Sequence, residues 1–300
     1  MKIATTTRDF NSYVQSQEEA IQYLSQAGFK YLDYSACMDY VKKNGIYSAN
    51  WKQHIERVKK LTESLGVEFV QSHAPNGRPI EKGEYHIQFV NDTKRSIECS
   101  AALGIKNVVV HAGYEAGISK EENFKRNKDF FLEILSCAEE YDVNILVENF
   151  NRMEHEEIYW IDSALDLREL VDYVNHPLFH ACWDVGHGNM QQMPQDESLR
   201  VLGKHVYALH VQDNLGNEDS HIPPFFGTVN LDSLMHGLKE IGYKGYFTFE
   251  ADRFFGNPCR RIFEKDSRLL QVPLQLRIKA ESLLYEIGKT ILSSYDCFEE

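Results

Sequence analysis

Six short apolar segments of this sequence each end in an ionisable side chain, and these residue types are the ones that could do chemistry. They are His73, His111, Glu148, Asp184, His210 and Glu250, with His187 three residues beyond Asp184. Each has an ordinary explanation by itself, as a hydrogen-bonded core histidine, a capping aspartate or a surface glutamate. Six independent coincidences in consecutive apolar segments are much less plausible, so we interpret these residues as parts of one site.

The elements that must position these residues follow from the hydrophobic pattern, in which short apolar runs alternate with segments of helical periodicity. Ser16 and Gly28 bound the first helical segment, while Asn50 and Ser119 head two others. Strict alternation of strands and helices implies a parallel sheet, and eight such units favour a (β/α)8 TIM barrel of the α/β class. We predict strands over residues 2–6, 29–34, 67–72, 107–110, 143–147, 181–183, 206–211 and 246–250.

The predicted barrel spans residues 1–252, and residues 253–300 form a C-terminal helical extension packed on it, with helical stretches on either side of Pro273. In a barrel of this kind the carboxyl ends of all strands open on the face where active sites are built. The six residues would therefore point into one bowl. Carboxylates and imidazoles gathered there repel one another unless they share protons or a cation, so we expect a divalent metal.

Composition narrows the class of protein. The 300 residues carry a formal net charge of −13, which argues against nucleic-acid binding through a broad basic surface and against docking to anionic lipid. No apolar run reaches the ~18 to 20 residues that a membrane span needs, and the first residues have no export-signal pattern. The six cysteines include no C-x-x-C pair. We expect a cytoplasmic protein with reduced cysteines.

At these residues the chain resembles the xylose isomerase-like barrel superfamily, which contains sugar and sugar-phosphate isomerases, 3-epimerases, inosose dehydratases and the endonuclease IV group. The likeness covers roughly residues 1–252. Its marks are a His-x-Gly at His111, a Glu-Asn at Glu148, an Asp-x-x-His at Asp184, a strand-seven His and a strand-eight Glu. Residues 219–227 are similar to the family's Asp-x-His-x-x-Pro-Gly-x-Gly loop, with Phe225 in place of the first glycine.

The resemblance implies metal ligands at Glu148, Asp184, His210 and Glu250. Three carboxylates and one imidazole favour Mn²⁺, with Mg²⁺, Co²⁺ or Zn²⁺ as alternatives. Glu148 and Glu250 are the expected catalytic pair, one removing a proton and the other returning it. The candidates for substrate binding are His73, His111, His187, Asp219, His221 and Arg253. For Arg253, a plain ion pair with an acidic residue of the tail stays open.

The expected function is a metal-dependent sugar or sugar-phosphate isomerase or epimerase of carbohydrate metabolism, working through an enediolate. An inosose-type dehydratase on the same scaffold, acting on a cyclitol, stays open, as does a homo-oligomeric state. The main alternative is an endonuclease IV-type abasic-site nuclease with three zinc ions. All nine of its ligand types have counterparts here, but His111-Ala-Gly stands where that group has His-Pro-Gly. Asp33, at the end of the second strand, is left without a role.

Overall fold

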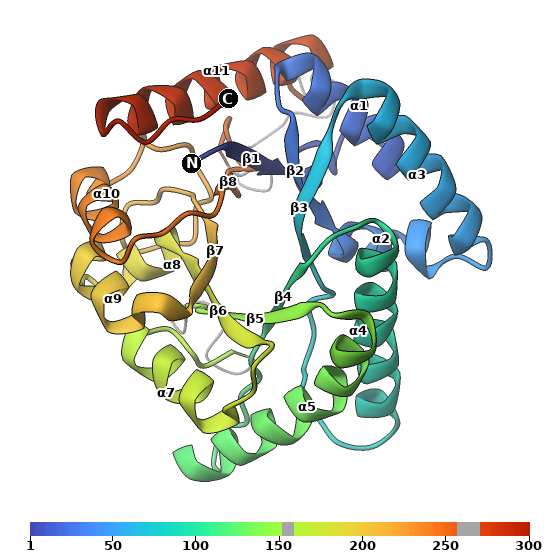
Figure 1. Cartoon of the computed structure of the whole chain (residues 1–300), viewed down its shortest axis with the longest axis vertical. Helices are drawn as coiled ribbons and strands as arrows, with labels where there is room; N and C mark the ends of the chain where they lie inside the picture. Colours follow the sequence, from blue (N-terminus) through green and yellow to red (C-terminus); the bar gives the residue numbers. More distant parts are fainter. Residues whose placement is uncertain (152–158, 257–270) are drawn as a thin grey trace, which may run out of the picture.

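Eight parallel strands form a ring around the centre of the molecule (Figure 1). The computed structural model describes residues 1–151, 159–256 and 271–300. The strands follow the order β7-β6-β5-β4-β3-β2-β1-β8, and a parallel bridge between Val211 and Phe249 joins the two end strands. They are β1 (Ile3–Thr6), β2 (Tyr31–Ser35), β3 (Glu68–His73), β4 (Asn107–His111), β5 (Asn144–Glu148), β6 (Phe179–Asp184), β7 (Val206–His210) and β8 (Phe247–Phe249). The predicted (β/α)8 barrel is confirmed.

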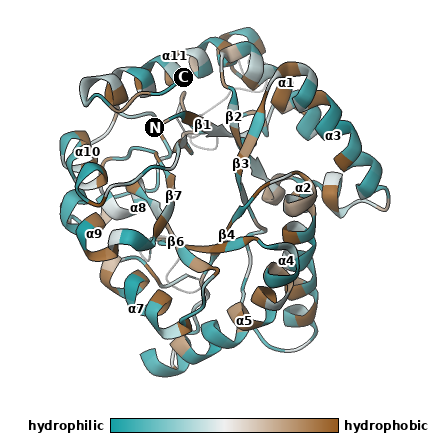
Figure 2. Ribbon diagram, in the orientation of Figure 1, coloured by the Kyte–Doolittle hydropathy of each residue, from teal (hydrophilic) through white to brown (hydrophobic). Residues whose placement is uncertain are grey.

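Helices surround the strands (Figure 1), and several combine apolar and polar residues along one ribbon (Figure 2). That amphipathic pattern lets each helix bury one side against the sheet. The α-helices are α1 (Gln17–Ala27), α2 (Ala36–Lys42), α3 (Trp51–Leu65), α4 (Glu84–Ala102), α5 (Lys120–Tyr141), α7 (Ala164–Val174), α8 (Val185–Met190), α9 (Gln195–Leu202), α10 (Leu231–Glu240) and α11 (Leu274–Ser294). Short 3-10 helices are η1 (Thr7–Phe10), η2 (Gly45–Tyr47) and η3 (Gly203–His205).

Local signals account for most of the helix ends. The Ser16 hydroxyl accepts a hydrogen bond from the Glu19 amide at the start of α1, and Gly28 ends that helix in the left-handed region with φ 107°. Asn50 occupies the N-cap position of α3, as expected, but its side chain makes no capping hydrogen bond. Helices α2 and α8 escaped prediction because seven and six residues are too few to show helical periodicity.

Helix α11 packs against α1 and β1, beside the junction of β1 and β8 (Figure 1). The helix contains a buried ion pair, in which Arg277 Nη2 lies 2.5 Å from Glu281 Oε1. Of the two helical stretches predicted around Pro273, the one that precedes it falls mostly outside the described residues. The domain boundary at residue 252 stays a prediction. Among the described helices, none is both long and apolar enough to cross a membrane.

Candidate active site

The candidate site is built by the two-residue period of the strands. Val109, Leu146, Cys182 and Ala208 form a small apolar cluster of buried residues contributed by β4 to β7. Successive side chains of a strand point to opposite faces, so the residue two positions later points the same way. Two positions later on these four strands stand His111, Glu148, Asp184 and His210. The apolar cluster therefore lies inside the barrel beneath the site. The four ionisable side chains form the next layer, towards the carboxyl ends of the strands.

Glu148 lies at the centre of this layer. One of its oxygens, Oε2, is 2.8 Å from His111 Nε2 and 3.3 Å from His73 Nε2, while Oε1 is 2.7 Å from His210 Nδ1. Burial by itself would raise the pKa of Glu148, but the three imidazoles hold it well below the usual range. Glu250 joins from the end of β8, with its Oε2 3.6 Å from His210 Nδ1. Glu148 is thus held as a carboxylate.

Asp184 carries an unsatisfied oxygen into the same layer. Its Oδ1 accepts a 2.6 Å hydrogen bond from the His187 amide and thereby caps α8, as the ordinary explanation for this aspartate predicted. Its Oδ2 is buried and has no hydrogen-bond partner within the described residues. Burial, with added repulsion from Glu148 and Glu250, raises the pKa of Asp184 to about 7. A buried, unpaired carboxylate oxygen is costly, and a cation would satisfy it.

The four predicted metal ligands meet the geometric requirement for a shared cation. Glu148, Asp184, His210 and Glu250 each offer one ligand atom, and these atoms all lie within 4.8 Å of one another. In an octahedral complex with bonds of about 2.1 Å, neighbouring donors are about 3 Å apart and opposite donors about 4.2 Å apart. The donor set therefore fits a divalent metal.

Two further groups of residues satisfy the same 4.8 Å criterion, namely His73, Glu148 and His210, and His187, Asp219 and His221. In the second group, Asp219 Oδ2 is 3.1 Å from His221 Nε2 and 3.4 Å from His187 Nε2. Burial opposes protonation of His221, but Asp219 outweighs it and raises the pKa of this imidazole to about 10. The endonuclease-like interpretation uses nine residues. Eight of them belong to these three groups, and the ninth, His111, contacts Glu148.

A cavity of about 350 Å³ opens above this layer. Eight residues that the sequence analysis singled out line it, which are His73, His111, Glu148, His187, Asp219, His221, Glu250 and Arg253. Asp184 and His210, the other two members of the layer, are buried and are not among the lining residues. The Arg253 Nη1 atom donates a 2.7 Å hydrogen bond to the Asp219 carbonyl oxygen. The alternative interpretation, an ion pair of Arg253 with an acidic residue of the tail, falls largely outside the described residues.

The sequence analysis missed several residues of the cavity, among them Arg8, Asn76, Phe150 and Tyr159. Arg8 lies in η1, two residues beyond the end of β1. Its Nη1 lies 3.5 Å from Glu250 Oε1, and its Nε lies 3.3 Å from Asp252 Oδ2. A search that extended two residues beyond each strand end would also have found Arg8.

Gln212 was also missed, although it lies two residues beyond His210. Its Nε2 donates to Asp219 Oδ1 at 2.8 Å and to Asp184 Oδ1 at 3.3 Å, so it bridges the two acidic groups. Gly186 makes room for it, because a Cβ atom there would lie 2.1 Å from the Gln212 side chain. Such a close approach can be seen only in the folded structure.

In the loop between β7 and α10, Phe225 stands where the family motif has its first glycine, and its backbone is left-handed. Phe225 adopts φ 76°, a left-handed conformation that costs an L-residue roughly 1–2 kcal/mol, and its side chain is exposed. Asp213 holds the loop by accepting hydrogen bonds from the amides of Gly227 and Val229, each at 3.0 Å. The loop thus forms with Phe225 in place, and it carries Asp219 and His221 to the cavity.

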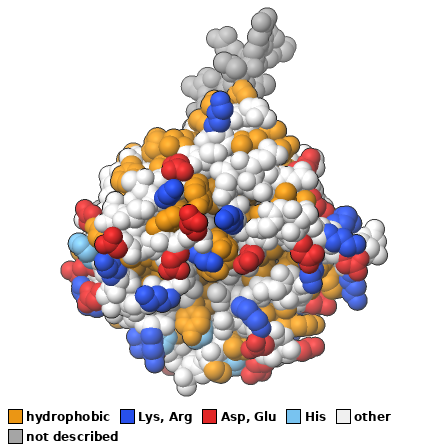
Figure 3. All heavy atoms as spheres, turned by 45° about the horizontal axis from the view of Figure 1, so that its top comes forward, with side chains coloured by type: hydrophobic (Ala, Val, Ile, Leu, Met, Phe, Trp, Pro, Cys, Tyr) orange, Lys and Arg blue, Asp and Glu red, His pale blue; other side chains and the backbone are white. Residues whose placement is uncertain are grey.

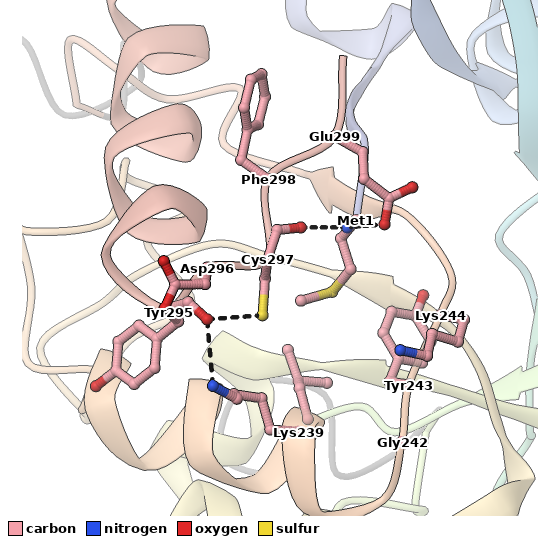
Figure 4. A pocket seen from close by; sticks show the side chains of 11 residues that line it. Met1, Lys239, Gly242, Tyr243, Lys244, Tyr295, Asp296, Cys297, Phe298 and Glu299 are labelled. Atoms are coloured by element: carbon pink, nitrogen blue, oxygen red, sulfur yellow. Dashed lines mark hydrogen bonds and ion pairs between the residues drawn. The ribbon is translucent and has the colours of Figure 1, made fainter.

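Another cavity, of about 310 Å³, lies at the amino-terminal end of the barrel beside both chain ends (Figure 4). The Met1 ammonium group there pairs with Glu299 Oε1 at 2.8 Å, and Lys239 Nζ donates to the Tyr295 carbonyl oxygen at 3.2 Å. These contacts tie the C-terminal tail to the barrel. In (β/α)8 barrels the amino-terminal end serves stability rather than chemistry, so we interpret this cavity as structural.

The architecture and the residues at the strand ends are those of a (β/α)8 enzyme. The chain belongs to the xylose isomerase-like TIM barrel family, whose sequence model matches residues 21–269. The uncharacterized protein MJ1311 of Methanocaldococcus jannaschii is 29% identical over 206 residues, covering 66% of this chain and 69% of that protein. The inosose isomerase of Bacillus subtilis is 28% identical over 181 residues, covering 58% of this chain and 63% of that protein. The relatives of named activity are isomerases or epimerases of sugars and inososes.

Solved structures agree with the fold. A D-tagatose 3-epimerase-like protein superimposes with a TM-score of 0.72 at 21% identity, covering 98% of this chain and 100% of that chain. The IolI protein with a bound zinc atom superimposes with a TM-score of 0.76 at 19% identity, covering the full length of both chains.

Proposed function

We propose that this protein is a divalent-metal-dependent epimerase or isomerase of a small sugar, sugar phosphate or cyclitol ketone. The observation that carries the proposal is the unpaired, buried Asp184 oxygen within a group of four potential ligands that includes Glu148 and Glu250. A cation held there would withdraw charge from neighbouring oxygens of a hydroxy ketone and make the C–H bond between them more acidic. Among the candidate metals, Mn²⁺ suits three carboxylates and one imidazole best.

The proton transfers fall to the two glutamates. Glu148 and Glu250 come from strands that are not neighbours, and both line the cavity. One removes a proton to give an enediolate, and the other returns a proton to the same or the adjacent carbon. The imidazoles of His73 and His111 lie beside Glu148, and burial lowers the pKa of His111 to about 4. A neutral His111 can orient a substrate hydroxyl without adding charge.

Deuterium incorporation tests this proposal. The metal-loaded enzyme is incubated in D₂O with a panel of ketoses, ketose phosphates and inososes, while product formation is followed in parallel. We expect an isomeric product with deuterium at a carbon next to the carbonyl, because the glutamate exchanges its proton with solvent before returning it. Product without deuterium would indicate a shielded transfer. Isomerisation that is unchanged after metal removal would contradict the proposal.

A second candidate, an abasic-site nuclease with several metal ions, is favoured by the three ligand groups that meet the same distance criterion. The net charge of −13 opposes it, since phosphate contacts dominate DNA affinity. On the face shown in Figure 3, positive and negative side chains are interspersed. We therefore expect no nicking of abasic duplex DNA above a metal-only control. Efficient nicking that is lost in Glu148→Ala and Glu250→Ala, with three zinc ions bound, would favour the nuclease.

We further propose that the enzyme works in a reducing compartment, the cytoplasm, on a small-molecule substrate. The five cysteines that the structure describes are free. Structural disulfides are rare in the cytosol, and this chain is large enough to fold without them. An unchanged free energy of unfolding with and without a reductant would support this proposal.

A further inference from the structure

Asp33 contacts His210 across the inside of the barrel. Its Oδ2 lies 3.1 Å from His210 Nε2, although β2 and β7 are not adjacent in the sheet. Both side chains are only 1% exposed. A carboxylate so deeply buried depends on the hydrogen-bond donors around it, because water does not reach it. The donors here face Oδ2, and Oδ1 has no hydrogen-bond partner within the described residues.

The two ring nitrogens of His210 face different groups. Nδ1 lies 2.7 Å from Glu148 Oε1 and 3.6 Å from Glu250 Oε2, so it points into the group of predicted metal ligands. Nε2 points to Asp33. A neutral imidazole has one N–H donor and one nitrogen with a free lone pair, and only the latter can bind a metal. In the neutral ring, a proton on Nε2 leaves the lone pair of Nδ1 available to a metal, whereas a proton on Nδ1 removes it.

A chain of hydrogen bonds makes Asp33 an acceptor. The Thr248 hydroxyl donates to Gln71 Oε1 at 3.2 Å, which orients the Gln71 amide so that its Nε2 donates to Asp33 Oδ2 at 2.9 Å. Thr248 and Gln71 are as deeply buried as Asp33. The remaining partner of Oδ2 must then be a donor as well, and His210 Nε2–H is the group in reach.

We propose that Asp33 is a positioning residue that keeps the proton of His210 on Nε2 and leaves the Nδ1 lone pair for the metal. The proposal rests on the proposed metal site. Asp33 is not itself a member of the three ligand groups. The Cys182 thiol also borders His210, but a thiol is a weaker hydrogen-bond partner than a carboxylate.

Metal affinity of Asp33→Asn tests the role of the carboxylate. The amide is isosteric, but its NH₂ group can donate to Nε2 and so move the His210 proton to Nδ1. Partners of this kind typically change metal affinity 10–100-fold, and we expect a loss of that size in a Co²⁺ titration, with a changed visible spectrum. Asp39→Asn is the matched control, because Asp39 is equally buried but bonds to Tyr34 and Gln17 outside the site. We expect wild-type affinity there.

The tautomer can be observed directly in the wild-type protein, which guards against a variant that fails to fold. In Zn²⁺-loaded protein with ¹⁵N-labelled histidine, we expect the His210 signal, assigned by its loss in His210→Asn, to show Nε2–H. An Nδ1–H tautomer, or equal Co²⁺ affinity in wild type and folded Asp33→Asn, overturns the proposal for Asp33 alone. Wild-type protein that binds no divalent metal contradicts the metal site itself, and the role of Asp33 falls with it.

Discussion

Glu148 is the side chain on which the contacts of the site converge, since three imidazoles lie within 3.3 Å of its carboxylate. A Glu148→Gln variant keeps an oxygen that can hold metal but removes the group that takes a proton. We expect metal-saturated Glu148→Gln to retain part of its metal and to lose turnover by ~10²–10⁴-fold. Turnover and metal content are measured on the same preparation, with Glu139→Gln on the surface of α5 as control. Turnover near that of wild type would remove Glu148 from the chemistry.

Glu18 also has a displaced pKa, and it is not among the residues that line the active-site cavity. Burial would raise its pKa, but contacts with His54 Nδ1 at 3.4 Å and Arg57 Nε at 3.1 Å lower it to about 2. A carboxyl with a folded-state pKa below its unfolded value of about 4.5 contributes stability above pH 4.5, and this is lost as pH falls towards 2. We expect Glu18→Gln to lower the free energy of unfolding at pH 6 by about 1–2 kcal/mol.

The same variant should also lose stability less steeply between about pH 4.5 and pH 2, because the proton-linked contribution of Glu18 is gone. Urea unfolding across this pH range measures both effects. Glu56→Gln, an exposed position on the same helix as His54, serves as the control and should follow the wild-type curve. Parallel curves for wild type and Glu18→Gln would contradict the assignment.

At the scale of elements, helix α8 begins at a predicted metal ligand, so Asp184 has two separable tasks. Its Oδ1 caps the helix, and its Oδ2 is free for a cation. Asn is as good an N-cap as Asp, whereas Ala loses about 1 kcal/mol. We expect Asp184→Asn and Asp184→Ala to lose most of the bound metal, and the metal-free Ala variant to be about 1 kcal/mol less stable than the Asn variant. Equal unfolding free energies of the two variants would exclude the capping role.

At the scale of the whole molecule, α11 is joined to the barrel by buried charges. Arg277 Nη2 lies 2.5 Å from Glu281 Oε1 and 3.9 Å from Asp9 Oδ1 in η1, and all three side chains are buried. Removing one partner of such a group leaves uncompensated charge, which typically costs 3–5 kcal/mol. We therefore expect Arg277→Met to lower the free energy of unfolding by about 3–5 kcal/mol.

A double variant separates this charge effect from lost packing. Arg277→Met with Glu281→Leu removes both members of the close pair, and such replacements of buried ion pairs by apolar residues are often nearly neutral. We expect the double variant to regain much of the stability that the single variant loses in urea unfolding. A double variant that is less stable than Arg277→Met would mean that apolar packing, not charge, dominates this contact.

The fold followed from local features of the sequence. Capping by Ser16 and the left-handed Gly28 bound the first helix as expected, and the repeated change between strand and helix periodicity implied a closed parallel barrel. The short helices α2 and α8 were the exceptions, because too few residues contribute to their pattern. The strand-end rule also located most of the cavity, since the position of a residue at the carboxyl end of a strand is a local property.

The amino-acid order alone sufficed for the barrel and for the set of polar residues at its carboxyl face. Only the tertiary structure decided which atoms of these residues face one another. Asp33 and His210 are 177 residues apart in sequence, and their contact exists because closure brings the inward faces of distant strands together. The free Asp184 oxygen and the Gln212 bridge depend likewise on strand register and on backbone approach at Gly186. Periodicity says which face a side chain occupies, whereas three-dimensional packing sets its partners.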